Sequence, residues 1–180
     1  MAGVYISWPF CAQKCTYCNF ASGVHAKSTE VEYADALLRE IAGHEWALRP
    51  DTVYIGGGTP SAADPAAIAA VLNAVPGRPW LEATIETAPG SFDTTKVEAW
   101  QAAGINRVSL GVQSFVKREL VRTGRRHDAE VVRNDVALLR DHGLDNINID
   151  LIAGLPGQTS ESWDESLAAT IALDVPHVSV

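Results

Sequence analysis

The chain has 180 residues, of which 47% are hydrophobic and 20% charged, and a formal net charge of −8. This composition fits one globular domain with a sizeable core. The negative charge excludes a general attraction to nucleic acid, and no apolar run approaches the roughly 20 residues that span a bilayer. The amino terminus lacks a secretory pattern and the few cysteines suit a reducing compartment, so we expect a cytoplasmic protein without a transmembrane segment.

The first predicted strand, at residues 4–6, enters a loop that holds every cysteine of the chain. Cys11, Cys15 and Cys18 are spaced C-x3-C-x2-C. Three thiolates do not complete a tetrahedral zinc site by themselves, and an odd number cannot pair fully into disulfides. They can hold three irons of a cubane iron–sulfur cluster and leave the fourth iron open to a ligand. The alternatives are a zinc site completed by His25 or His44, or simple buried thiols.

Strands and helices alternate along the rest of the chain. Apolar, β-branched runs predict strands at residues 52–55, 81–87, 106–112 and 146–152, and a last strand that begins at 175. Capping signals predict helices from Thr29 to about 49 and from 65 to 75, and others at 93–104, 117–127, 128–140 and 160–173. Thr29 and Glu32 form the capping box of the first helix. Repeated β–α units with apolar strands predict a parallel sheet covered by helices.

Glycines and polar side chains gather where the predicted strands end. A Gly-Gly-Gly-Thr-Pro segment at 56–60 follows the second strand, Glu86 ends the third and Gln113 follows the fourth. Asp150 lies in the apolar fifth strand, where an unpaired carboxylate is costly, so it needs a partner or a ligand. The carboxyl ends of parallel strands are the ligand-binding edge of α/β folds. Because the cysteine loop meets the same edge, a closed or partial barrel is favoured over an open doubly wound sheet.

Each of these features also has a simpler interpretation. The glycines could form only a tight turn, and Glu86 could be a surface or capping group. His127 and His142 are expected on helix surfaces, and the basic run at 117–127 on a solvated helix face. Neither Ser109 nor Ser114 has a histidine–carboxylate pattern that indicates a nucleophile.

Taken together, the motifs resemble the radical S-adenosylmethionine (radical SAM) superfamily. The cysteine spacing, with an aromatic residue before the third cysteine, is similar to its signature. Residues 56–61, 111–115 and 150–159 resemble the branch that contains oxygen-independent coproporphyrinogen III oxidase and the HemW heme chaperones. The resemblance implies a partial (β/α)6 TIM-like barrel over residues 1–180, truncated within or near its sixth strand, with the C-terminal substrate or heme region beyond it. It also implies that Cys11, Cys15 and Cys18 hold a [4Fe-4S] cluster whose reduction cleaves SAM to methionine and a 5′-deoxyadenosyl radical.

The same resemblance assigns nine residues to the binding of SAM. It implies adenosine contacts from Tyr5 and Tyr17. It implies that the methionine part of SAM meets Gly57, Gly58 and Thr59. Further SAM-contacting positions are matched by Glu86, Gln113, Arg125 and Asp150.

Details near the cysteines favour one group of the branch. Phe20 stands where the oxidase usually has a further cysteine, and Trp8 before Pro9 is also similar to the chaperone group. Ser7 replaces a histidine common to both groups, which argues against porphyrinogen-oxidising chemistry, and no catalytic residue is assigned. The sequence is therefore interpreted as a HemW-like heme chaperone that binds the cluster, SAM and, through the absent region, heme. An electron donor such as flavodoxin or ferredoxin and heme-receiving client proteins are the expected partners; the alternatives are the oxidase, acting on a porphyrinogen, and a thiolate zinc or electron-transfer protein.

Overall fold

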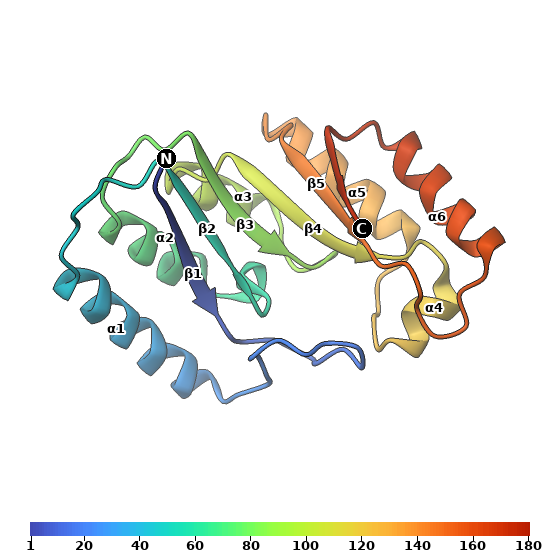
Figure 1. The fold of residues 1–180 in the computed structure, drawn as a ribbon, viewed down its shortest axis with the longest axis horizontal. Helices are drawn as coiled ribbons and strands as arrows, with labels where there is room; N and C mark the ends of the chain where they lie inside the picture. Colours follow the sequence, from blue (N-terminus) through green and yellow to red (C-terminus); the bar gives the residue numbers. More distant parts are fainter.

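Parallel strands form one curved sheet in the computed structural model, which describes residues 1–180 (Figure 1). The strands are β1 (Gly3–Trp8), β2 (Thr52–Gly57), β3 (Glu82–Thr87), β4 (Arg107–Gln113), β5 (Ile147–Leu151) and β6 (His177–Ser179). They pair in the order β1-β2-β3-β4-β5-β6, all in parallel. A strand order that follows the sequence has no reversal point, which is typical of a barrel wall and not of a doubly wound sheet. Because β1 and β6 do not pair, the predicted partial (β/α)6 barrel is confirmed as an open arc.

Helices connect the strands and lie along the outer side of the arc (Figure 1). They are α1 (Lys27–Gly43), the 3-10 turn η1 (Pro60–Ala62), α2 (Pro65–Ala74), α3 (Thr94–Ala102), α4 (Lys117–Arg122), α5 (Ala129–Asp141) and α6 (Ser160–Ala172). Parallel strands joined by right-handed crossovers carry successive helices to the same face of the sheet. Several predicted helix starts are confirmed by side chains that accept a bond from a free N–H of the first turn: Asp64, Asp93, Asp128 and Thr159.

The predicted start of the first helix is wrong. Helix α1 begins at Lys27, its N-cap Ala26 makes no side-chain capping bond, and Thr29 already donates its N–H to the Ala26 carbonyl. An ion pair of 2.7 Å between Lys27 and Glu30 lies across this first turn. The helix also ends at Gly43, before the expected end near residue 49, and β6 covers only His177–Ser179. The short helix α4 ends at Arg122, so the second half of the basic run is a loop.

The two faces of the sheet differ in chemistry. The outer face, which the helices cover, supplies much of a core of 32 buried apolar residues. Alternate residues of each strand point to the opposite, inner face. That face carries polar side chains from every strand: Tyr5, Ser7, Tyr54, Glu82, Thr84, Glu86, Arg107, Ser109, Asn148, Asp150, His177 and Ser179. Along each strand, apolar residues of the outer face therefore alternate with polar residues of the inner face.

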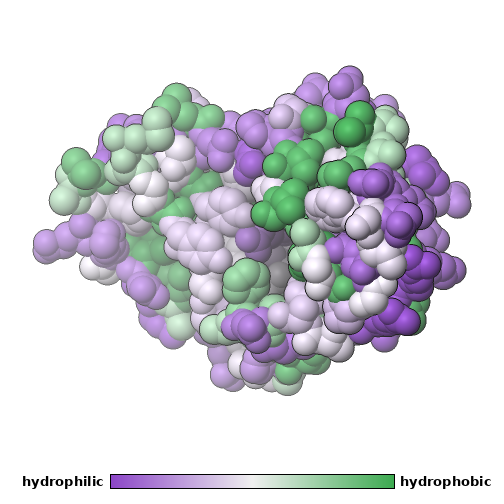
Figure 2. All heavy atoms as spheres, turned by 45° about the vertical axis from the view of Figure 1, so that its right-hand side comes forward, coloured by the Kyte–Doolittle hydropathy of each residue, from purple (hydrophilic) through white to green (hydrophobic).

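The surface shows no single extended apolar area in the view of Figure 2. Apolar side chains on this face lie in several separate groups among polar ones. None of the helices combines the length and the apolar character needed to cross a bilayer.

A buried carboxylate in α5 gives the fold a pH-dependent contact. Asp135 is 6% exposed, and its Oδ2 accepts a 2.7 Å hydrogen bond from the Gly90 N–H in the loop after β3. Burial raises the pKa of this carboxyl to about 6, against the opposing effect of the Gly90 bond. The folded state thus favours the neutral acid. The stability that neutral Asp135 contributes is complete below the ordinary pKa near 3.8 and is lost as the pH rises through about 6.

Asp135→Asn is expected to stabilise the fold at pH 8 and to have little effect at pH 4. The amide keeps an oxygen for Gly90 and removes the buried charge, which we expect to raise the free energy of unfolding at pH 8 by on the order of 1–2 kcal/mol. Urea denaturation at both pH values measures the difference. Asp35→Asn, at an exposed position of α1, is the matched control. Equal effects of both variants at pH 8 would contradict the assignment of a raised pKa to Asp135.

Candidate functional site

The cysteine loop, residues 9–23, leaves the carboxyl end of β1 and closes on itself. The Cys11 N–H donates to the Gly23 carbonyl, and the Gly23 N–H to the Pro9 carbonyl, both at 2.9 Å. Inside the loop the Lys14 ammonium donates to the Ser22 carbonyl at 2.9 Å. The loop is therefore a defined structure, held by its own backbone.

All three cysteines are unpaired and partly exposed. No three His, Cys, Asp or Glu side chains converge closely enough in this structure to hold a metal ion, so the gathering of the three sulfur atoms stays a prediction. The donor set fits an iron–sulfur cluster, because three accessible thiols lie on one short loop. Of the two histidines considered as a fourth zinc ligand, His44 follows the far end of α1, about 25 Å of helix away, and His25 packs edge-on against Phe10 at 5.6 Å.

Aromatic packing fixes the direction in which the cysteine loop leaves the sheet. Trp8 is fully buried and contacts Phe10 and Tyr33 edge-on, with ring centroids 5.7 and 6.1 Å away. The Tyr33 hydroxyl also donates to the Ser7 carbonyl at 2.8 Å. Helix α1 is thereby joined to the first turn of the loop.

The glycine segment after β2 joins the sheet to the cysteine loop. The Gly58 N–H donates to the Trp8 carbonyl and the Thr59 N–H to the Phe10 carbonyl, each at 2.8 Å. A Cβ atom on Gly58 would lie 2.5 Å from the Phe10 oxygen and 2.6 Å from the Trp8 oxygen, so only glycine fits. Gly57 has a φ of 107°, a conformation that glycine adopts without strain. The simpler interpretation as a tight turn is incomplete, because the segment is bonded to the loop that carries the cysteines.

Glu86 ends β3 beside this segment. Its Oε2 accepts a 2.8 Å bond from the Gly57 N–H, and its Oε1 accepts a 2.9 Å bond from the Tyr54 hydroxyl. Burial, and secondarily the Glu86 charge, raise the pKa of both Tyr54 and Tyr5, whose rings stack at 5.7 Å. A Cβ on Gly56 would lie 2.6 Å from the Glu86 carboxyl carbon, so a larger residue there would displace the Glu86 side chain. Glu86 is therefore an oriented carboxylate and not a helix cap.

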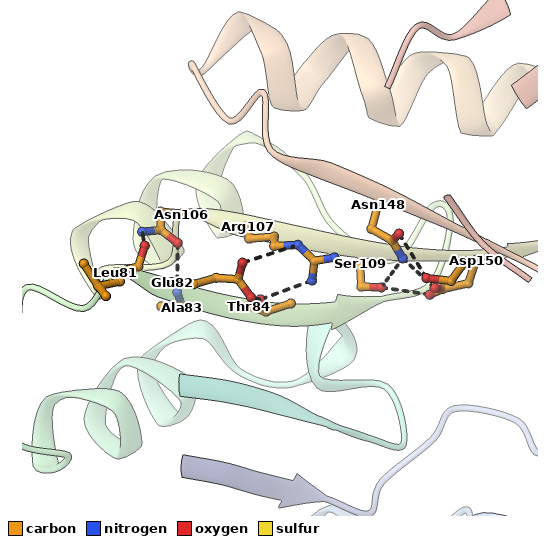
Figure 3. A network of polar contacts seen from close by, with 10 residues as sticks. Leu81, Glu82, Ala83, Thr84, Asn106, Arg107, Ser109, Asn148 and Asp150 are labelled. Atoms are coloured by element: carbon orange, nitrogen blue, oxygen red, sulfur yellow. Dashed lines mark hydrogen bonds and ion pairs between the residues drawn. The ribbon is translucent and has the colours of Figure 1, made fainter. Parts of the chain in front are cut away.

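Asp150 has the partners that its apolar strand requires. The Ser109 hydroxyl donates to Oδ2 at 2.9 Å and the Asn148 amide to Oδ1 at 2.6 Å (Figure 3). Burial raises the pKa of Asp150, and the bonds from Ser109, Asn148 and Ser179 oppose the rise. The carboxylate is thus held in one orientation on the inner face by β4, β5 and β6.

The polar network continues towards the amino ends of the strands. Arg107 lies 3.8 Å from the Glu82 carboxylate, and its guanidinium donates to the Thr84 hydroxyl at 3.4 Å (Figure 3). The Thr84 hydroxyl in turn donates to Glu82 at 3.1 Å. Because these groups bond to one another, they form a polar network on the inner face beside Glu86 and Asp150.

Arg125 and Tyr17 meet across a second part of the site. The Arg125 Nε and Nη2 donate to the Tyr17 hydroxyl at 3.1 and 2.8 Å. Burial raises the pKa of Tyr17 to about 12, although Arg125 lowers it. Gln113 lies near the same guanidinium, since both side-chain groups surround Gly111: a Cβ there would be 3.0 Å from the Gln113 Nε2 and 3.6 Å from the Arg125 Nη2.

The expectation that His127 lies on a helix surface is wrong. The imidazole is 9% exposed, in the loop between α4 and α5, and its Nε2 is 3.1 Å from the Val112 carbonyl. Burial lowers the pKa of His127 to about 4, and the Arg125 charge acts in the same direction. The basic run also contains an acidic residue, Glu119, which is fully buried and accepts a 2.7 Å bond from the Ser114 hydroxyl.

The structure thus brings the predicted residues together in three groups on the carboxyl edge of the sheet. Glu86 lies with Gly57 and Tyr5, Arg125 lies with Tyr17 and Gln113, and Asp150 follows on β5. The sequence interpretation missed the side chains that orient them, which are Tyr54, Ser109 and Asn148. In the sequence, these three residues could have been found as the polar residues that recur at every second position of the strands.

Comparisons with known proteins identify the family of this chain. The sequence profile of the Radical SAM superfamily matches residues 5–169. A protein of Synechocystis sp. named heme chaperone HemW is 37% identical over 97% of this chain and 45% of its own length. The heme chaperone HemW of Escherichia coli is also 37% identical, over 98% of this chain and 49% of its own length. The chain therefore spans about half the length of these curated relatives.

Solved structures share the fold. Coproporphyrinogen III oxidase (HemN) from Escherichia coli, described as a radical SAM enzyme, matches 99% of this chain and 43% of its own with a TM-score of 0.88 and 28% identity. The radical SAM methyltransferase TsrM from Kitasatospora setae matches with a TM-score of 0.68 at 18% identity, which supports the fold only. With a superfamily profile matched over nearly its whole length and a barrel of the same kind, this chain belongs to the radical SAM superfamily.

Proposed function

We propose that this chain is the SAM-binding core of a HemW-like heme chaperone of the cytoplasm. The observation that carries the proposal is the direct connection between the cysteine loop and the glycine segment through the bonds of Gly58 and Thr59. This connection keeps three unpaired thiols beside the edge where Glu86 is oriented. The names of the relatives supply the chaperone part of the proposal.

Cys11, Cys15 and Cys18 would hold the [4Fe-4S] cluster of this core. A radical SAM domain uses such a cluster to cleave SAM reductively. The chain itself contributes three thiols, a loop closed by backbone bonds and the Lys14 ammonium, which is bonded inside that loop. Three protein ligands leave one position of a four-iron cluster for another molecule.

SAM carries an ammonium, a carboxylate, a ribose and an adenine, and the carboxyl edge offers a chemical complement for each kind of group. Glu86 and Asp150 are oriented carboxylates that suit ammonium and hydroxyl donors. Arg125 is a cation with a planar fork that suits a carboxylate. Tyr5 and Tyr17 add aromatic surface, and Gln113, Gly57, Gly58 and Thr59 complete the proposed set.

Glu86→Gln is expected to weaken SAM binding at least 10-fold. The amide keeps the size of the side chain, but it removes the negative charge that the Gly57 N–H and the Tyr54 hydroxyl orient. Equilibrium dialysis of labelled SAM against the reconstituted chain measures the dissociation constant. Glu165→Gln, on the exposed surface of α6, is the control and should bind as the unmodified chain does. An unchanged dissociation constant for Glu86→Gln rejects the role of Glu86 in SAM binding.

The proposal extends to heme, an electron donor such as flavodoxin or ferredoxin, and client proteins that receive heme. The alternative is an oxygen-independent coproporphyrinogen III oxidase, which is supported by the likeness to the HemN structure. Phe20 favours the chaperone, because it stands at the position where the oxidase usually has another cysteine; its side chain is 66% exposed.

One experiment separates the two activities. The protein, produced at the length of its relatives and with its cluster reconstituted, is incubated anaerobically with SAM, reductant and coproporphyrinogen III, and is titrated in parallel with heme. The chaperone proposal predicts stable heme binding and no protoporphyrinogen. Formation of protoporphyrinogen with turnover supports the oxidase instead.

A further inference from the structure

The end of β4 contains a bulge that turns Gln113 out of regular strand geometry. Pairing with β5 shifts between Gly111 and Gln113, so Val112 has no partner residue on that strand. Gln113 has a φ of 70°, which a residue other than glycine keeps only where its surroundings hold it. Bulges of this kind redirect side chains next to binding sites.

His127 contacts this bulge from the loop between α4 and α5, in addition to the bond from the Ile152 N–H to the Gln113 carbonyl at 3.0 Å. Its Nε2 is 3.1 Å from the Val112 carbonyl, which is the carbonyl of the bulged residue. A carbonyl only accepts, so the imidazole carries its proton on Nε2 and is the donor. The charged groups that face the ring are Arg125 and Asp128. Because the ring is buried and its donor is used, it is not available to transfer protons to a ligand.

The loop that carries His127 is also bonded to the cysteine loop. The Thr16 N–H donates to the Thr123 carbonyl at 3.3 Å, and the Gln13 amide donates to the Gly124 carbonyl. Arg125 completes the connection through its two bonds to the Tyr17 hydroxyl. Residues 122–128 therefore join the cysteine loop at one end to the β4 bulge at the other.

We propose that His127 is a positioning residue for SAM, whose bond to the Val112 carbonyl fixes Arg125 and Gln113 relative to each other and to the cysteine loop. The inference rests on the proposed function, because Arg125 and Gln113 are its proposed SAM contacts. Without the bond, the Val112 carbonyl loses its partner and the loop is free to shift along the bulge. SAM would then meet the two side chains in many arrangements, and its binding would include the free energy of ordering them.

The test compares three substitutions in the chain with its cluster reconstituted. His127→Gln keeps an N–H donor at about the reach of Nε2, His127→Asn keeps the donor but is one methylene shorter, and His127→Leu removes it. The readouts are iron and sulfide per chain, the SAM dissociation constant, and the change in the electron paramagnetic resonance spectrum of the reduced cluster on addition of SAM. His142→Leu is the matched control, because His142 also bonds a main-chain carbonyl, that of Leu138 at 2.9 Å, in a different part of the fold.

We expect full cluster content in all folded variants. SAM binding should weaken at least 10-fold in His127→Leu and in His127→Asn, and it should stay within about 3-fold of the unmodified chain in His127→Gln and His142→Leu. Equal SAM affinity in the Gln and Asn variants overturns the inference. It is also overturned if Leu and Asn both leave the chain unfolded while Gln folds, because the bond then serves general stability. Failure of the unmodified chain to bind SAM rejects the proposed function itself, and this outcome is separate from the others.

Discussion

Cys15→Ala is expected to leave a folded chain that cannot assemble a four-iron cluster. Cys15 is partly exposed and unpaired, so its removal does not disturb the core, but it takes away one of only three thiols in the chain. Two thiolates hold a cubane cluster poorly, since the protein supplies too few ligands. Anaerobic reconstitution followed by iron and sulfide analysis and by absorbance in the charge-transfer region measures the loss.

A second change in the same loop provides the control for Cys15→Ala. Asn19 is exposed and has no side-chain hydrogen bond, so Asn19→Ala should retain the cluster of the unmodified chain. Thermal unfolding followed by circular dichroism should be alike for both variants. A stoichiometric four-iron cluster in Cys15→Ala would refute the assignment of the three ligands.

Gly58→Ala is expected to destabilise the fold and to disrupt the cysteine loop at the same time. A methyl group at this position would lie within 2.6 Å of two backbone oxygens, those of Trp8 and Phe10, and backbone cannot rotate away as a side chain does. The glycine segment and the loop must separate, which breaks the bonds from the Gly58 and Thr59 N–H groups. We expect the free energy of unfolding to fall by about 2–3 kcal/mol or more, together with lower cluster content.

Gly43→Ala is the matched control, because a Cβ there meets no atom within 4 Å. Gly43 is the last residue of α1, where alanine is the better helix former, so this variant should gain up to about 1 kcal/mol of stability. The two alanine substitutions are thus expected to have opposite signs in urea denaturation. A Gly58→Ala chain as stable as the unmodified one would show that the close approach of the two backbones is not required.

Much of the fold could be predicted because its signals are local. Asp64, Asp93 and Asp128 precede their helices directly, and each accepts the capping bond that its position implies. Thr29 carried the same kind of pattern and did not cap its helix, because the chain leaving the cysteine loop had already begun the helix at Lys27. A short capping motif depends only on its own residues, so it does not predict a helix start that the preceding loop determines.

The candidate site was predictable where a polar residue ends a predicted strand, as Glu86 does, or interrupts an apolar one, as Asp150 does. Glu86 and Asp150 could be chosen for that reason, and both lie on the inner face. Tyr54, Ser109 and Asn148 were harder to recognise, since each is a common strand residue whose role depends on a neighbouring strand. His127 could not be found from the sequence, because its partner Val112 lies on another element and its neighbours are charged residues typical of a surface.

The central claim is that the cysteine loop and the Glu86 edge form one binding site. Its most direct test is the electron paramagnetic resonance spectrum of the reduced, reconstituted chain with and without SAM. We predict one four-iron cluster per chain and an electron paramagnetic resonance signal that changes when SAM is added. The Glu86→Gln chain should form the same cluster and need at least 10-fold more SAM for the same change. Stoichiometric zinc in place of iron, or a cluster whose spectrum SAM does not alter, would contradict the claim.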